Sequence, residues 1–301
     1  MSAPAIRDVV IAWWNTSVAR VAGRRRTIER DRIAVARETI GEVSQIAHAL
    51  FLCEVAPELE REITPEGKNW VWGGDGVSRL GDIACVLSPE VFDLPARPTP
   101  ISDAEDGPTL DARVVRFDLT AGYVPVALFG VHSHSRPGDS TGRLRRKVAS
   151  MLRASVTQSR KDTPHVIVAG DFNDEPFDQS VSETLRTSRD ARVAANDGRL
   201  LYNPCWRFMH DGDANAEHGL VGTARGGDPE TRWRAFDQIL MSSVWLDRDP
   251  PCFSGTCLVL RPAALMTREG RPMRKPFDHL PVAARFLLGR GEVSHVERQE
   301  G

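Results

Sequence analysis

The most constraining feature of this chain is the ten-residue segment HVIVAGDFND at residues 165–174. Its apolar run predicts a buried β-strand, and Gly170 lets the backbone turn sharply where that strand ends. Asp171 and Asn173 flank Phe172, so in extended backbone their side chains point to the same side. A carboxylate and an amide at a strand end suit the holding of a nucleophilic water beside a phosphate. A plain Asp/Asn turn after a core strand is the alternative interpretation.

A second polar motif lies near the C-terminus, in FDHLPVAARF at residues 277–286. Asp278 and His279 directly precede a strand-like run, and Pro281 restricts that run to an edge strand or to the start of a strand. An Asp-His pair at a strand start is a compact way to hold an imidazole beside a metal or a phosphate. A polar turn before a final strand is the alternative interpretation.

GDFN followed by DHLPV resembles the endonuclease/exonuclease/phosphatase superfamily, which includes pancreatic deoxyribonuclease, AP endonucleases, inositol polyphosphate 5-phosphatases and neutral sphingomyelinases. Further signatures of that family follow in the expected order. VVIAWWNTS ends a strand at Asn15, and ALFLCEVAPE places the single acid Glu54 after an apolar strand. A carboxylate there is costly to bury unless it is paired or bound to a metal. The resemblance implies that Glu54 binds a metal ion and that Asn15 helps to bind metal and phosphate.

Two more strand motifs complete the set. VALFGVHSHSR ends an apolar strand at His132, and RAFDQILMSS places Asp237 before another strand. The resemblance implies that His132 faces the scissile phosphate and that Asp237 orients the catalytic histidine. The signatures run from Asn15 to His279, so the resemblance covers nearly the whole chain.

Three positions depart from the family's pattern. Phe277 stands where a serine often precedes the final Asp-His pair, Val131 replaces the usual asparagine before the strand histidine, and Ala224 replaces the tyrosine of a GTY…W loop. None of these changes removes a core catalytic group. They bear on the class of substrate more than on activity.

The predicted cofactor is a divalent metal ion, Mg²⁺ first and Mn²⁺ as a possible substitute. The predicted metal ligands are Asn15, Glu54 and Asp278. Mg²⁺ usually takes a few oxygen ligands from a protein and fills its remaining positions with water and substrate phosphate. Such an ion polarises the phosphoryl oxygen in phosphodiester hydrolysis.

The predicted catalytic residues surround that ion. Asp171 is expected to orient or deprotonate the attacking water, and Asn173 to hold the phosphate. His279, and His132 braced by Asp237, are expected to stabilise the pentavalent state and to assist the leaving oxygen. Histidine suits this task because its unperturbed pKa lies near neutrality.

Basic residues cluster beside three of the motifs, although the formal net charge of −2 excludes a bulk polycation. A ligand with a phosphate backbone is attracted to such basic rims. Nucleic acid is therefore the predicted partner, with Arg271, Arg274 and Lys275 as substrate-binding residues, and ordinary solvated arginines are the alternative. The clusters are Arg24, Arg25 and Arg26; Arg143, Arg145, Arg146 and Lys147; and Arg268, Arg271, Arg274 and Lys275.

Three functions are compatible with these motifs and basic clusters. A nuclease that cleaves DNA or RNA is favoured, because arginines flank the active-site strands. The alternative is a phosphatase or phosphodiesterase acting on a small or lipid head-group phosphoester, which requires a tight pocket that a sequence does not reveal. A non-catalytic binding protein on the same fold is disfavoured, because the full set of chemical groups is present.

The composition predicts one domain. The 301 residues contain 41% hydrophobic residues, which suits a single domain over residues 1–289 with a charged, frayed tail at 290–301. The apolar run at residues 9–14 is too short for a signal sequence or a membrane span. Five irregularly spaced cysteines argue against a disulfide framework or a zinc site and favour a reducing compartment. We therefore expect a cytoplasmic location, without a membrane partner, and the sequence identifies no protein partner.

The hydrophobic pattern predicts both strands and helices. Strands in long runs with helices between and outside them predict two packed sheets flanked by helices. The resemblance implies the same α+β fold, a four-layer α/β/β/α sandwich of two mixed β-sheets packed face to face, with the site at one end. Helices are expected at residues 25–49, 143–159 and 180–185, strands at 80–87 and 112–119, a loop at 93–108, and a long irregular segment at 202–232.

Overall fold

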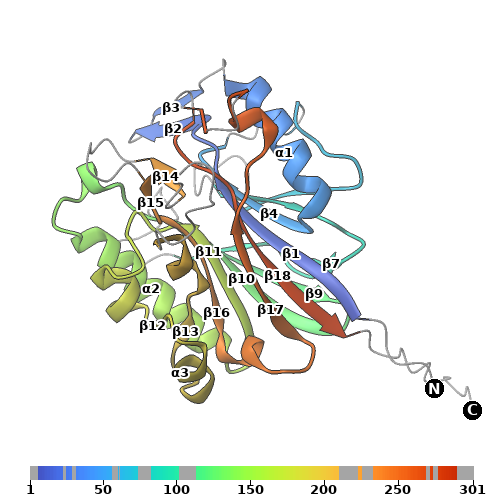
Figure 1. Ribbon diagram of the computed structural model, residues 1–301, viewed down its shortest axis with the longest axis vertical. Helices are drawn as coiled ribbons and strands as arrows, with labels where there is room; N and C mark the ends of the chain where they lie inside the picture. The colour runs from blue at the N-terminus through green and yellow to red at the C-terminus, as the bar shows by residue number, and fades with distance from the viewer. Residues whose placement is uncertain are drawn as a thin grey trace, which may run out of the picture.

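The structure is a computed structural model and describes residues 6–22, 25–28, 32–55, 60, 62–73, 83–101, 113–209, 223–225, 233–268, 272–273 and 277–289. Within these ranges, two large β-sheets pack against each other and helices lie on the outer side of each sheet (Figure 1). This arrangement confirms the predicted α+β fold with its α/β/β/α layers.

The first sheet joins strands from the beginning and the end of the chain. Its strands are β1 (Ile6–Asn15), β4 (Ala49–Cys53), β5 (Asn69–Trp72), β6 (Ala84–Leu87), β17 (Cys252–Val259) and β18 (Val282–Gly289). They follow the order β17-β18-β1-β4-β6-β5. β1 is antiparallel to β18 and parallel to β4, so the carboxyl ends of β1 and β4 lie at the same edge.

The second sheet is built from the middle of the chain. Its strands are β7 (Phe92–Asp93), β8 (Thr99–Ile101), β9 (Val114–Ala121), β10 (Val124–His132), β11 (His165–Asp171), β12 (Thr187–Ser188), β13 (Leu201–Tyr202) and β16 (Asp237–Ser242). The order is β12-β13-β16-β11-β10-β9-β7, and β8 pairs with β9. β10 and β11 are parallel, whereas β16 is antiparallel to β11. The carboxyl ends of β10 and β11 therefore meet the beginning of β16.

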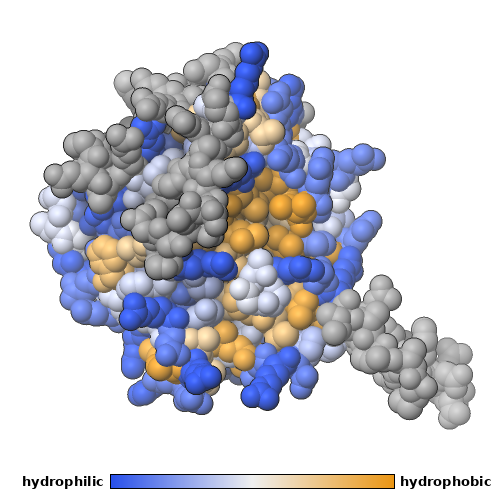
Figure 2. Space-filling model, in the orientation of Figure 1, coloured by the Kyte–Doolittle hydropathy of each residue, from blue (hydrophilic) through white to orange (hydrophobic). Residues whose placement is uncertain are grey.

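The helices cover the outer faces of the sheets. α1 (Ile33–Ile46) packs on the first sheet, and α2 (Arg143–Ser159) and α3 (Ala191–Asn196) lie beside the second (Figure 1). In α2, Val148, Leu152 and Val156 recur every four residues, and this spacing forms the buried stripe of the helix. Figure 2 shows an apolar area on the face of the molecule that it draws. Among the described residues, Ile46 at the end of α1 and Leu258 on β17 are large hydrophobic residues that are 50% and 46% exposed.

Two short hairpins accompany the sheets in the described residues. β2 (Ala19–Ala22) pairs with β3 (Arg25–Ile28) directly after the end of β1. β14 (Ala224–Arg225) pairs with β15 (Trp233–Arg234) just before β16 begins. Both hairpins therefore adjoin the edge where β1 ends and β16 begins.

One of the predicted helices matches the structure, and another differs from it at both ends. The helix predicted at residues 143–159 is confirmed by α2, which has the same bounds. The helix predicted at 25–49 is wrong at both ends, because residues 25–28 pair as β3 and Ala49 pairs in parallel with Ile11. Helical spacing within 33–46 was real, but strand pairing with distant residues determined where the helix ends.

Other predicted segments are shorter or more regular than expected. The strands predicted at 80–87 and 112–119 correspond to β6 and β9, while residues 80–82 and 112, like 102–108 of the predicted loop, lie outside the described residues. The segment at 180–185 contains one turn of π-helix, Ser180–Thr184, and the loop at 93–108 contributes the short strand β8. Residues 290–301, the predicted tail, lie outside the described residues, as do 210–222 and 226–232 of the predicted irregular segment. No helix in the described ranges is long and apolar enough to cross a membrane.

Gly170 is required by close packing rather than by a turn. A Cβ atom at this position would lie 2.5 Å from the carbonyl oxygen of Val131 in the neighbouring strand β10. Gly41 in α1 is the opposite case, because an added Cβ meets no atom within 4 Å.

We therefore predict opposite effects of the same substitution. Gly170→Ala should destabilise the protein by about 1–3 kcal/mol, because β10 and β11 must move apart. Gly41→Ala should stabilise it by about 0.5–1 kcal/mol, because alanine loses less backbone entropy in a helix. Urea unfolding of both variants measures these free energies. A Gly170→Ala protein as stable as the wild type would contradict the close strand contact.

Candidate active site

The candidate site is the polar end of the core between the two sheets. Side chains on a strand alternate between its faces, and the inward-facing row of β1 runs Val9, Ile11, Trp13 and then Asn15. Three strands of the second sheet follow the same rule at this edge. Beside apolar inward-facing residues they carry a polar side chain at the edge, which is His132 on β10, Asp171 on β11 and Asp237 on β16.

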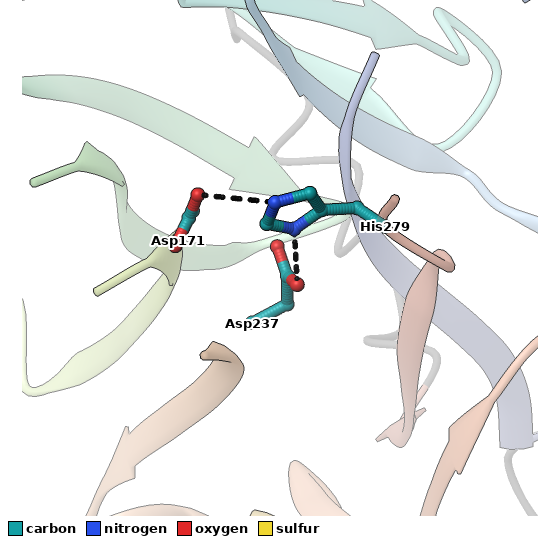
Figure 3. Close-up of side chains that lie close together, drawn as sticks. All are labelled: Asp171, Asp237 and His279. Carbon is teal, nitrogen blue, oxygen red and sulfur yellow. Dashed lines mark hydrogen bonds and ion pairs between the residues drawn. The ribbon is translucent and has the colours of Figure 1, made fainter. Parts of the chain in front are cut away.

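Asp237 and His279 form the best-defined pair in the site. Asp237 is fully buried, and its Oδ2 lies 2.8 Å from His279 Nδ1 (Figure 3). Trp13 Nε1 donates to its Oδ1 at 3.0 Å, and the Thr223 hydroxyl donates to its Oδ2 at 2.9 Å. The other imidazole nitrogen, Nε2, lies 3.8 Å from Asp171 Oδ2. The buried carboxylate therefore fixes the imidazole so that Nε2 faces Asp171.

The charges around His279 favour its protonated form. Burial lowers the pKa of the imidazole, but the carboxylates of Asp237, Asp171 and Asp278 outweigh burial and raise that pKa well above its ordinary value. These carboxylates therefore favour the imidazolium over the neutral imidazole in this arrangement. A fixed positive charge at this position suits the stabilisation of a phosphate group.

Glu54 and Asp171 are joined by the amide of Asn15. Asn15 Nδ2 donates to Asp171 Oδ2 at 3.1 Å and lies 3.5 Å from Glu54 Oε1. His132 Nε2 lies 3.6 Å from the same Glu54 oxygen. The prediction that Asp237 braces His132 is therefore wrong. β11 separates β10 from β16 in the sheet, so Asp237 reaches His279 while His132 lies beside Glu54.

Asp278 is held at the exposed side of the site. Ser17 Oγ donates to Asp278 Oδ1 at 3.0 Å, and Ser17 N donates to Asn15 Oδ1 at 3.0 Å. The backbone of the following residue, His279, forms a β-bridge with Ala224. These contacts bring Asp278 into the same network as Asn15.

Backbone strain concentrates at this site. Of the four non-glycine residues with positive φ in the described ranges, three belong to it: Ser17 at 48°, Glu54 at 52° and Asn173 at 52°. Such conformations cost free energy and cluster where function requires a particular geometry. Asn173 therefore does not continue the strand, as alternation along an extended chain predicted. A turn returns it to Asp171, whose Oδ1 accepts from Asn173 N at 2.9 Å.

The donor set fits a divalent metal ion. Glu54 and Asp171 carry like charges, and both approach the neutral amide of Asn15, so a bound cation would relieve their repulsion. Oxygen donors of this kind match Mg²⁺ or a similar hard cation. Asp171, Asp237 and His279 also bring ligand atoms within 4.8 Å of one another. Asp237, however, already accepts three side-chain hydrogen bonds. These three residues are therefore better described as the hydrogen-bonded pair Asp237–His279 beside Asp171 than as a metal site.

Most of the predicted site residues, but not all, lie in the part of the chain that the structure describes. The structure brings together Asn15, Glu54, His132, Asp171, Asn173, Asp237, Asp278 and His279. The predicted substrate-binding residues Arg271, Arg274 and Lys275 lie outside the described residues.

Three residues that shape the site were missed from the sequence. Trp13 reads as a core residue, yet its indole binds Asp237. Ser17 and Thr223 bind their carboxylates through hydroxyl groups. A polar residue just after a strand-end asparagine was the available signal for Ser17. The GT of the GTARGG segment was the signal for Thr223.

Comparison with known proteins places the chain in a family. A sequence model described as the Endonuclease/Exonuclease/phosphatase family matches residues 74–287, so the chain belongs to this family. Enzymes of this family are phosphoester hydrolases that depend on a divalent metal. No curated protein sequence matches the chain.

Solved structures share the fold at low sequence identity. TDP2 from Caenorhabditis elegans has a TM-score of 0.61 at 17% identity, covering 93% of this chain and 74% of that chain. D. rerio TDP2 humanised by 14 mutations has a TM-score of 0.58 at 17% identity, covering 93% and 98%. A Bacteroides thetaiotaomicron mannosyl-6-phosphatase has a TM-score of 0.58 at 16% identity, covering 93% and 99%. At such identities the similarity establishes the fold alone.

The charge of Asp237 should control the titration of His279. Asp237→Asn keeps the shape but removes the negative charge, so we predict that the pKa of His279 falls. The imidazole of the variant should then lose its proton at lower pH than that of the wild type. NMR titration of the imidazole protons in metal-free protein measures this shift.

Asp118→Asn is the matched control, because that carboxylate pairs with Arg116 on β9. This substitution should leave the titration of His279 unchanged. An unaltered pKa of His279 in Asp237→Asn would contradict the assigned pair.

Proposed function

We propose that the protein is a Mg²⁺-dependent phosphodiesterase that acts as a nuclease on DNA or RNA. The observation that carries this proposal is the placement of His279 between two carboxylates, with Nδ1 on Asp237 and Nε2 toward Asp171. An oriented imidazolium can act as a general acid, and a nearby carboxylate that holds a water molecule can act as a general base in the hydrolysis of a phosphodiester. Mn²⁺ is the proposed substitute metal, and the cytoplasm remains the predicted location.

The metal ligands are proposed to be Asn15, Glu54 and Asp278. When bound there, a divalent ion supplies positive charge that polarises the phosphoryl oxygen. Glu54 has a side chain that is 21% exposed, which leaves this group accessible to water and substrate. Ser17 holds Asp278 in orientation through its hydroxyl.

Asp171 is the proposed acceptor of the proton from water. Asn15 donates to one of its carboxylate oxygens and the backbone of Asn173 donates to the other. Each oxygen retains a further acceptor site, so Asp171 can accept a hydrogen bond from the attacking water and take its proton. The Asn173 amide nitrogen donates one hydrogen to Ser133 O at 3.2 Å and has a second for a phosphate oxygen.

The leaving oxygen requires a proton donor. As an imidazolium, His279 stabilises the charge that develops on the phosphoryl group and can donate its Nε2 proton. Asp237 then retains the neutral imidazole in the same orientation. His132, which lies beside Glu54, is the second candidate for this role.

Basic residues near the site support a polyanionic substrate. The first two turns of α2 contain Arg143, Arg145, Arg146 and Lys147 and no acidic residue in the first turn. The Asp139 carboxylate already accepts from the backbone nitrogen of Arg145 at this helix N-terminus, so support for an external anion comes from the basic side chains themselves. Arg145 is buried and paired with Asp174, whereas Arg143 is exposed to a ligand.

A small phosphoester is the second candidate substrate. The fold is shared with a mannosyl-6-phosphatase as well as with TDP2, which has been crystallised in complex with a single-strand DNA product. The same phosphoryl chemistry serves both kinds of substrate. The choice between them depends on residues at the rim of the site.

A substrate panel tests the proposed activity. Purified protein is incubated with Mg²⁺, with Mn²⁺ or with EDTA against plasmid, single-stranded DNA, RNA and a set of phosphomonoesters. We expect metal-dependent cleavage of at least one polynucleotide. Hydrolysis of phosphomonoesters alone would support the phosphatase, and no hydrolysis of any phosphoester would contradict the proposal.

Glu54→Gln tests the metal site. The substitution keeps the side-chain shape but removes the charge that holds the cation, so turnover should fall by on the order of a hundredfold or more. Metal titration of turnover should show a much weaker apparent affinity. Glu38→Gln on the exposed face of α1 is the matched control and should leave both quantities unchanged. Near-full turnover of Glu54→Gln in Mg²⁺ would exclude Glu54 as the ligand.

The predicted substrate-binding arginines make a separate test. Replacing Arg271 and Arg274 with alanine should weaken polynucleotide binding and flatten its salt dependence by about one unit of log–log slope per lost phosphate contact. Turnover at saturating substrate should change much less, because the metal ligands and the histidines remain. Binding affinity is measured across a salt series. An unchanged slope together with good turnover of a small phosphoester would favour the phosphatase.

A further inference from the structure

We propose that Arg136 is a positioning residue for the reaction, which holds Asn173 and the start of β16 in the geometry that the chemistry requires. The inference rests on the proposed function, because it assigns a role in that same site. Arg136 begins the short 3-10 helix η3 (Arg136–Gly138), four residues after His132 at the end of β10.

The guanidinium of Arg136 closes the loop that follows β11. Its Nε donates to the backbone carbonyl oxygen of Asn173 at 3.1 Å. Its Nη2 pairs with Asp178 Oδ2 at 2.5 Å. The same Asp178 oxygen accepts from the backbone nitrogen of Glu175 at 2.7 Å. One side chain thus binds both ends of the segment 173–178.

Asn173 depends on outside support for its conformation. Its φ of 52° is sparsely populated for a residue other than glycine. Asp171 accepts from its backbone nitrogen, and Ser133 accepts from its side-chain amide. Arg136 binds the remaining backbone group, the carbonyl, and so fixes the orientation of the peptide that follows Asn173.

The same guanidinium contacts the beginning of β16. Its carbon atom lies 4.9 Å from the centroid of the Phe236 ring, in a cation–π contact. Phe236 directly precedes Asp237, and its carbonyl oxygen accepts from the backbone nitrogen of Phe172 at 2.9 Å. Arg136 therefore links three segments, and each carries a predicted catalytic residue: His132, Asn173 and Asp237.

Arg136 is separable from the fold, unlike its neighbour in the network. Arg145 is buried with Asp174, its side chain being 7% exposed, so its loss would leave a buried charge unpaired. The side chain of Arg136 is 37% exposed. Its removal opens the rim of the site to water without emptying the core.

Steady-state kinetics on the best substrate of the wild type test the inference. In Arg136→Ala we expect kcat to fall by about tenfold with KM nearly unchanged, because catalytic groups shift while substrate contacts remain. Arg136→Lys should not rescue activity, because an ammonium cannot bind the carbonyl and the carboxylate in one plane while covering Phe236. Arg116→Ala is the control, since Arg116 forms a similarly exposed ion pair with Asp118 on β9.

A double-mutant cycle separates positioning from general stability. If Arg136 acts through Asn173, then adding Arg136→Ala to Asn173→Ala should cost little further kcat. Additive losses would overturn the role assigned to Arg136 at Asn173. A loss confined to KM would overturn the inference as a whole, because it would make Arg136 a substrate contact. An equal loss in Arg116→Ala would also overturn it.

Hydrogen exchange provides a measurement that does not depend on activity. Amides of residues 172–178 should exchange faster in Arg136→Ala than in the wild type or in Arg116→Ala, with protection elsewhere unchanged. Unchanged exchange in this segment would overturn the inference even in an active enzyme. A wild type that hydrolyses no phosphoester would instead refute the proposed function, and the exchange result would still decide whether Arg136 holds Asn173.

Discussion

The buried carboxylate of Asp237 is the interaction on which the rest of the site depends. A charge in the core costs several kcal/mol unless donors surround it. Here the donors come from three distant parts of the chain, namely Trp13 on β1, Thr223 before β14, and His279 before β18. Satisfying this one group therefore requires both sheets and the hairpin to be in place. The packing of the two sheets thus brings the donors to Asp237, and their hydrogen bonds fix the orientation of the imidazole.

The position of the site follows from the alternation of side chains on packed strands. The inward-facing rows of β1, β10, β11 and β16 are mainly apolar and end in a polar side chain at the same edge, so the core leads directly into a charged site. This placement keeps carboxylates and histidines on rigid strands, where their charges are little screened by water. The strained residues Ser17, Glu54 and Asn173 are all at this boundary. The well-packed sheets stabilise conformations that these residues would not adopt alone.

The sequence predicted which residues lie at strand ends better than it predicted their partners. His132, Asp171 and Asp237 were identifiable because polar residues interrupt apolar runs, and the order of motifs indicated the sandwich. The prediction that His132 is the partner of Asp237 is wrong because the partner depends on β11 lying between β10 and β16. That order of strands is set by pairing between segments far apart in the sequence. The role of Gly170 was likewise hidden, since the close contact comes from Val131 on another strand.

The residues proposed for the chemistry lie at strand ends, whereas the residues that select the substrate lie at the rim of the site. The chemistry is therefore easier to infer than the substrate. Phosphoryl transfer needs a few groups at fixed distances, and under the proposed function the packed strand ends and the pair Asp237–His279 would provide them. Substrate selection depends on side chains that reach beyond these strands, such as the exposed Arg143 of α2. TDP2 and a mannosyl-6-phosphatase share this fold at 16–17% identity, so the fold alone does not identify the substrate, and the side chains at the rim of the site must do so.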